Sequence, residues 1–174
     1  MVEVAFHGRV LHKFVETLSS EIGHESFSAV LSKAGLPEEW AHPAHFVALD
    51  DVRTAQAYAR LQSALRTYYG RGARGILFRI GAKLWEPLLD DSALGIKTQA
   101  AFIRGIPKSL RRKPALELLA RILSISTGEI TVHSLDLDLL LVDRASPTTL
   151  DQSDHAPICF VTHGLIRECL FWAV

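Results

Sequence analysis

Residues 128–144 read GEITVHSLDLDLLLVDR, and the hydrophobic pattern of the chain changes in this stretch. Short runs rich in β-branched residues and leucine predict two strands of a hairpin, over residues 129–134 and 137–144. The residues before it have helical spacing, and residues 158–173 predict a last helix that is apolar on more than one side and therefore buried. This order predicts an α+β fold, with a helical N-terminal two-thirds, a small antiparallel sheet and a buried C-terminal helix.

Six helices are predicted before the hairpin, because apolar residues recur there every three or four positions. Their predicted ranges are 8–22, 27–34, 52–69, 76–85, 94–105 and 114–123. Gly35 predicts a left-handed stop after the second helix, and Asp50 or Asp51 predicts a cap for the third. Pro87 is expected to end the fourth helix, and residues 40–49 are expected to form a loop.

Length and composition indicate one globular domain over residues 1–174. The chain has 174 residues, 48% of them apolar, which is enough to bury a core without a metal or disulfide. No apolar run approaches the length of a membrane span, and the N-terminus does not resemble a signal peptide. Two cysteines are too few for a disulfide scaffold, so we expect a reducing, cytoplasmic environment.

Charge is unevenly distributed although the formal net charge is zero. Residues 52–121 hold 14 basic and four acidic side chains, a net charge of +10, and the rest of the chain carries −10. The basic middle predicts either an anion-facing surface or contact with the acidic ends of the same chain or of a second subunit, and we favour the contact. The overall balance argues against direct nucleic-acid binding.

Two motifs have the residue types of a cofactor or metal site. Residues 70–75 match G-x-G-x-x-G, but a helical pattern precedes them, whereas a dinucleotide site needs a strand there. His155, Cys159 and His163 follow each other at four-residue steps, which would line one helical face with possible ligands. A fourth ligand is not evident, so a buried thiol beside a hydrogen-bonded histidine is the favoured interpretation.

Catalytic constellations are not evident, because no nucleophile elbow and no paired carboxylates stand out. Aromatic side chains cluster in the middle and at the end of the chain, as they do around pockets for apolar molecules, although core packing explains any one of them. His163 is the polar group expected to orient a ligand. The predicted ligand-binding residues are Tyr69, Phe78, Trp85, Phe102, Phe160 and His163.

Three stretches together resemble the V4R (4-vinyl reductase) domain family. YYGRGARGILFRIGAKLW (68–85) is similar to its aromatic-glycine segment, and GEITVHSLDLDLLLVDR (128–144) to its paired strands. APICFVTHGLIRECLFWA (156–173) resembles its stretch in which Pro-x-Cys precedes a glycine and an apolar helix. The resemblance covers most of the chain and implies a fold shared with subunits of the TRAPP vesicle-tethering complex.

The resemblance also implies a homodimer that binds small hydrophobic molecules, as in aromatic-sensing regulators. Metal-binding members of the family take zinc from the Pro-x-Cys cysteine, here Cys159, and from a downstream Glu-x-x-Cys…Cys segment. The sequence stops at Val174 without such a segment, so we expect no zinc. The loop over residues 145–156 also lacks the cysteine pair that relatives often carry.

Three functions remain after these observations. The first is a non-enzymatic sensor or carrier domain for a small hydrophobic ligand, acting as a homodimer without a cofactor. The second is a scaffolding module whose dimer surface is its function. The third is an enzyme or accessory protein of tetrapyrrole (bacteriochlorophyll) modification with a nicotinamide cofactor, supported only by the glycine motif. A filled core with an extended apolar surface would favour the scaffold, and a hollow core would favour the ligand.

Overall fold

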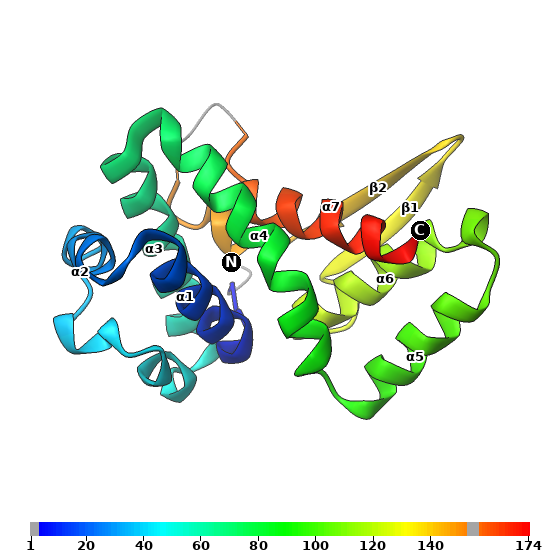
Figure 1. Cartoon of the computed structure of the whole chain (residues 1–174), viewed down its shortest axis with the longest axis horizontal. Helices are drawn as coiled ribbons and strands as arrows, with labels where there is room; N and C mark the ends of the chain where they lie inside the picture. The colour runs from blue at the N-terminus through cyan, green and yellow to red at the C-terminus, as the bar shows by residue number, and fades with distance from the viewer. Residues whose placement is uncertain (1–3, 153–156) are drawn as a thin grey trace.

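The computed structural model describes residues 4–152 and 157–174, and it has the predicted α+β fold. Helices make up most of this part, and a two-stranded antiparallel sheet follows the sixth α-helix (Figure 1). The helices are α1 (Gly8–Ile22), α2 (His24–Lys33), α3 (Asp51–Tyr69), α4 (Ala73–Asp90), α5 (Leu94–Gly105), α6 (Arg112–Leu123) and α7 (Phe160–Ala173). The strands are β1 (Ile130–Leu135) and β2 (Asp138–Asp143), and short 3-10 helices are η1 (Glu38–Ala41), η2 (Pro43–Ala48), η3 (Gly70–Gly72), η4 (Lys108–Leu110) and η5 (Pro147–Thr149).

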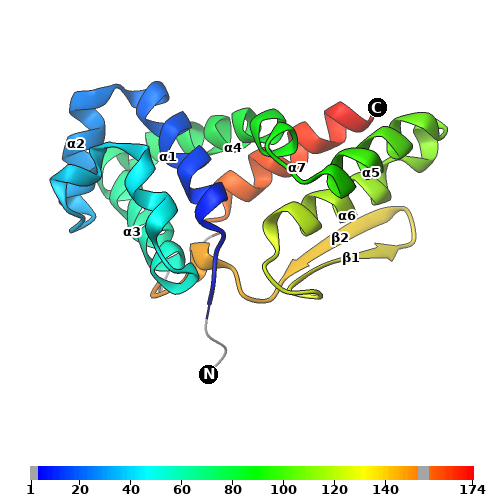
Figure 2. The same cartoon turned by 90° about the horizontal axis from the view of Figure 1, so that it is seen from below.

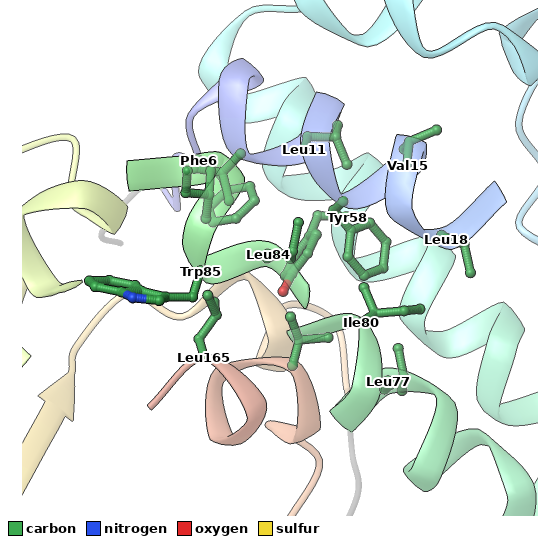
Figure 3. Packing of buried hydrophobic residues seen from close by; sticks show 14 of the residues in the cluster. Phe6, Leu11, Val15, Leu18, Tyr58, Leu77, Ile80, Leu84, Trp85 and Leu165 are labelled. Carbon is green, nitrogen blue, oxygen red and sulfur yellow. The ribbon is translucent and has the colours of Figure 1, made fainter. Parts of the chain in front are cut away.

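The main core lies between α1, α3, α4 and α7. Figure 3 shows apolar side chains from these four helices pointing toward one another. Phe14 of α1 is fully buried and meets the ring of Tyr58 edge-on, with 4.9 Å between ring centroids. The apolar face of α1 therefore provides the first wall of this core, as its helical spacing predicts.

Helices α4 and α7 cross at two glycines. A Cβ atom at Gly81 would overlap the carbonyl oxygen of Val161, and one at Gly164 would overlap that of Phe78. Only residues without a side chain allow two helix backbones to approach this closely. Because α4 also contacts α1 and α7 also contacts α6, this crossing joins the N-terminal helices to the C-terminal part of the chain.

The hairpin packs one of its faces on α6, which lies between the hairpin and α7 in Figure 2. Val132 and Leu139 of that face contact the core. Directly paired residues share a face of an antiparallel sheet, so the pairs His133–Leu140 and Leu135–Asp138 lie on the opposite face. That face carries no helix or strand among the described residues, and both of its leucines are exposed.

Local signals for helix ends are partly confirmed. Gly35 has the predicted left-handed conformation, with φ +64°. Asp50 is the cap of α3, because its side chain accepts a hydrogen bond from the amide of Arg53 at 2.8 Å. The predicted end at Pro87 is wrong, since α4 continues to Asp90. Burial of the following residue, Leu88, stabilises the last turn despite the hydrogen bond that proline cannot make.

Other boundaries also differ from the prediction, and α2 and α4 each begin three residues before the predicted ranges. Residues 40–49 lie largely in η1 and η2 instead of an irregular loop, because Phe46 is fully buried and its ring packs edge-on against Trp40. The last helix begins at Phe160, two residues later than predicted, and it is not buried all round. Its exposed face carries Arg167 and Phe171.

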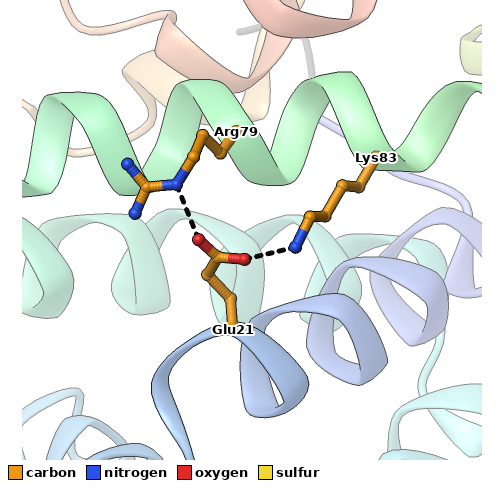
Figure 4. A network of polar contacts seen from close by, with 3 residues as sticks. All are labelled: Glu21, Arg79 and Lys83. Atoms are coloured by element: carbon orange, nitrogen blue, oxygen red, sulfur yellow. Dashed lines mark hydrogen bonds and ion pairs between the residues drawn. The ribbon is translucent and has the colours of Figure 1, made fainter.

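An ion-pair network holds α1 against α4 (Figure 4). One carboxylate oxygen of Glu21 accepts a hydrogen bond from Lys83 Nζ at 2.6 Å, and the other accepts one from Arg79 Nε at 2.7 Å. These two hydrogen bonds lower the pKa of Glu21 below its usual range, more than its partial burial raises it. The ionised carboxylate therefore stabilises the contact between the two helices.

Candidate functional site

Metal-binding and nucleophilic groups do not form a site in the part of the chain that the structure describes. No cluster of three or more histidine, cysteine, aspartate or glutamate side chains could hold a metal ion there, and His155 lies outside the described residues. Cys169 is buried and donates a hydrogen bond to the Ala115 carbonyl at 3.2 Å. Burial raises the pKa of Cys169 to about 12, and partial desolvation of the Cys159 thiol, in a residue that is exposed overall, raises its pKa as well. A nucleophilic cysteine needs a lowered pKa, so neither thiol is activated.

The glycine motif over residues 70–75 lies between two helices. Residues 70–72 form η3, the preceding residues are the end of α3, and α4 follows directly. A dinucleotide site of this type requires a strand before the first glycine. This segment therefore has the geometry of a tight interhelical connection and does not have that of a pyrophosphate cradle.

Three of the six predicted ligand-binding residues come together along the outer side of α4 and α7. The rings of Phe78 and His163 meet edge-on with 5.1 Å between centroids. Arg74 lies over the Phe160 ring at 5.6 Å. We call this row the α4–α7 seam, and it consists of Arg74, Phe78, Phe160, His163, Arg167 and Phe171.

The other three predicted residues lie apart from the seam. Trp85 is fully buried and packs edge-on against Trp172, with 5.3 Å between ring centroids, and its indole N–H has no hydrogen-bond partner among the described residues. Tyr69 packs against the neighbouring Tyr68 at the end of α3. Phe102 is 69% exposed on α5. The six side chains are thus distributed over the core, the seam and two other surfaces.

A small pocket lies where the base of the hairpin meets α1, α3 and α7, and its volume is about 30 Å³. Apolar residues such as Phe6 line it together with Tyr58, Asp143 and Thr148. Burial raises the pKa of both Tyr58 and Asp143. A pocket of this size accommodates a water molecule, whereas pockets for organic ligands have about 300–1,000 Å³.

A buried polar contact lies next to this pocket. The side-chain amide of Gln62 donates a hydrogen bond to the Thr148 hydroxyl at 3.2 Å, which ties α3 to η5. Among residues 4–152 and 157–174 the Gln62 carbonyl oxygen has no hydrogen-bond partner, although the side chain is buried. The hydrogen bond between Gln62 and Thr148 positions the loop after the hairpin. The unpaired carbonyl of the same side chain costs some of the stability that this bond provides.

An open groove of about 680 Å³ runs between α6 and the outer edge of β1. Arg121 and Ser124 line it on the side of α6, and Ile130, Val132 and His133 line it on the side of the strand. In the described residues β1 pairs only with β2, so the backbone groups along its other edge are unpaired. None of the six predicted ligand-binding residues lines this groove.

Large exposed apolar side chains concentrate in the C-terminal half, and Phe102 is the one among them that the sequence analysis singled out. The hairpin contributes three leucines, of which Leu137 in the turn is fully exposed. The other exposed ones in this half are Leu94, Phe102, Leu110, Phe171 and Val174. The triple leucine at 139–141 is a signal for this, because consecutive apolar residues give a strand two apolar faces, and one helix covers only one face.

Comparison of the chain with protein-family models, with characterised proteins and with solved structures finds no match. The resemblance to V4R domains and to TRAPP subunits therefore stays a prediction. No helix of the described residues is long and apolar enough to cross a membrane.

Proposed function

We propose that the protein is a non-enzymatic interaction module that assembles as a homodimer mainly through its C-terminal half. The observation that carries this proposal is the uncovered outer face of the hairpin, with Leu135 54% exposed and Leu140 44% exposed. Apolar patches of this kind on otherwise polar surfaces mark sites of protein association. A two-stranded sheet is also marginally stable alone, so a partner that covers it would stabilise it.

The packed core also favours an interaction module over a carrier of a hydrophobic ligand. The central side chains of α1, α3 and α4 are fully buried, among them Phe14, Leu65 and Leu77. The small pocket of about 30 Å³ at the base of the hairpin has room for water but not for a hydrophobic ligand. An interaction surface accounts for the exposed leucines, whereas a ligand-carrying core would leave them unexplained.

Binding of a small hydrophobic molecule is the second proposal, and the groove between α6 and β1 is the observation in its favour. Its volume of about 680 Å³ lies within the range of organic-ligand pockets. Ile130 and Val132 supply apolar surface there, and Arg121 and His133 supply polar groups that could orient a ligand. A ligand in this groove would contact the strand edge instead of the aromatic residues singled out in the sequence.

Native mass spectrometry of the purified protein tests both proposals at once. The interaction module predicts a dimer mass equal to twice the chain mass with no additional bound compound. A monomer mass with a stoichiometric small molecule would contradict the interaction module and support the ligand carrier. A monomer without bound compound would contradict the homodimer.

A further inference from the structure

The tip of the hairpin is an acidic, leucine-rich projection. Residues 129–143 contain four acidic side chains and no lysine or arginine. At the tip, which we define as residues 135–138, aspartates alternate with the exposed Leu135 and Leu137. Figure 1 shows the tip extending clear of the helices. Within the described residues, the side chains of Asp136 and Asp138 make no hydrogen bond or ion pair, so the tip presents both apolar surface and unpaired negative charge.

The α4–α7 seam has the opposite charge and a comparable apolar content. The guanidinium carbon of Arg167 lies 5.5 Å from the centre of the Phe78 ring and 5.0 Å from that of Phe171. Phe171 is 63% exposed. In residues 4–152 and 157–174 no carboxylate pairs with Arg74 or Arg167. The seam therefore offers cationic groups without counterions next to an exposed phenyl ring.

Cation–π contact with the rings restrains these guanidinium groups where they could bind carboxylates. An arginine whose guanidinium group contacts a ring loses less rotamer freedom when it forms a further bond, and its N–H groups can still donate to a carboxylate. Nucleic-acid bases would need open ring faces for stacking, and here the faces of Phe78 and Phe160 already carry guanidinium groups. The seam thus fits an acidic protein segment that also supplies apolar side chains.

We infer that the hairpin tip of one copy of this chain docks on the α4–α7 seam of a second copy. This inference rests on the homodimer of the proposed function and specifies which surfaces of the two copies meet. Asp136 and Asp138 would pair with Arg74 and Arg167, while Leu135 and Leu137 would cover Phe171. A two-fold axis makes both tip-to-seam contacts form at once, which closes the assembly at a dimer.

Charge reversal on either side tests this contact. The tip variant is Asp136→Asn with Asp138→Lys, in which asparagine tolerates the φ of 50° at residue 136. The seam variant is Arg74→Glu with Arg167→Glu. Glu38→Asn with Glu39→Lys, on two exposed residues of η1, makes the same charge change as the tip variant at a different place.

Sedimentation equilibrium at moderate ionic strength gives the dimer dissociation constant of each variant. We expect the tip variant and the seam variant each to raise this constant at least tenfold, because like charges then face each other. An equimolar mixture of the two should restore the dimer, since each acidic surface again meets a basic one. The η1 variant should dimerise like the wild type, and circular dichroism melts show whether each variant is folded.

The outcomes separate this contact from the homodimer itself. A wild-type chain that stays monomeric at high concentration would overturn both the homodimer and the tip-to-seam contact. A dimeric wild type whose tip and seam variants dimerise equally well would overturn the contact alone. Folded, monomeric variants whose mixture does not dimerise would also overturn it, because complementary charges would then fail to restore association.

Discussion

The N-terminal helices and the C-terminal half of this chain bury their apolar residues to different degrees. In α1, α2 and α3 the large aliphatic side chains turn inward, and Tyr68 is the exposed large apolar residue among the described residues of these helices. From α5 onward, eight large apolar side chains are exposed, on α5 and α7, the hairpin, the segment before α6 and the last residue of the chain. The N-terminal helices thus complete their own core, whereas the C-terminal half leaves apolar surface for a partner.

The largest expected loss of stability comes from a change at the crossing of α4 and α7, which joins the two regions. Gly164→Ala places a methyl group on the backbone of α4, so the helices must separate and the cores on both sides loosen. We expect a loss of at least about 3 kcal/mol in the free energy of unfolding. Urea denaturation followed by circular dichroism measures it.

Gly95→Ala is the matched control for this substitution. Gly95 lies in α5 with no atom within 4 Å of an added Cβ, so alanine should stabilise that helix by up to about 1 kcal/mol. Equal stability of the wild type and the Gly164→Ala variant would show that the crossing is looser than its geometry indicates.

Removal of one leucine from each region tests the comparison directly. Leu18→Ala empties a fully buried position in α1 and should cost about 2–5 kcal/mol. Leu137→Ala removes a fully exposed side chain and should change the stability of the isolated monomer by less than about 0.5 kcal/mol. Unfolding measured at a concentration too low for dimers compares the two, and a comparable loss from Leu137→Ala would contradict the described burial.

The carboxylate of Glu21, in the N-terminal region, makes a smaller contribution to stability, and this contribution depends on pH. Glu21 has a lowered pKa, so its contribution is present above the ordinary pKa of glutamate and is lost as the pH falls through the lowered value. Glu21→Gln should therefore cost about 1 kcal/mol near neutral pH and almost nothing in acid. Glu16→Gln, which removes an exposed ion pair with Lys13, should cost less stability at every pH. Equal losses from the two variants would contradict a stabilising role of the ion pairs of Glu21.

The smallest expected change in stability is at Asp143, at the base of the hairpin, and its dependence on pH is opposite to that of Glu21. Burial raises its pKa, so its contribution to stability is greatest in acid and declines as the pH rises through the raised value. Asp143→Asn should remove this decline and change the neutral-pH stability by less than about 1 kcal/mol. Urea titrations at several pH values test this, and a decline that persists in the variant would assign it to another group.

The sequence predicts the fold class well, because periodicity depends on local spacing. The hairpin strands, the first helix and the Asp50 cap are confirmed within one or two residues. Pro87 misleads since the burial of Leu88 outweighs the local cost of proline. Tertiary contacts of this kind are not visible in a local pattern.

The candidate surfaces were harder to predict than the fold. Aromatic residues identify the seam in part, since Phe78, Phe160 and His163 come together there. The sequence does not show that Trp85 points into the core while Phe102 points outward, because both lie on amphipathic helices. The sequence also gives no sign of which hairpin leucines are covered, because a strand flanked by a single helix buries only one of its faces.

Hydrogen–deuterium exchange at several protein concentrations tests most directly whether the C-terminal half is the part that a second copy covers. We predict that backbone protection in β1, β2 and α7 increases as the concentration passes the dimer dissociation constant, while protection in α1 and α3 stays constant. Protection that is independent of concentration throughout the chain, or that changes only in α1 and α3, would contradict this account.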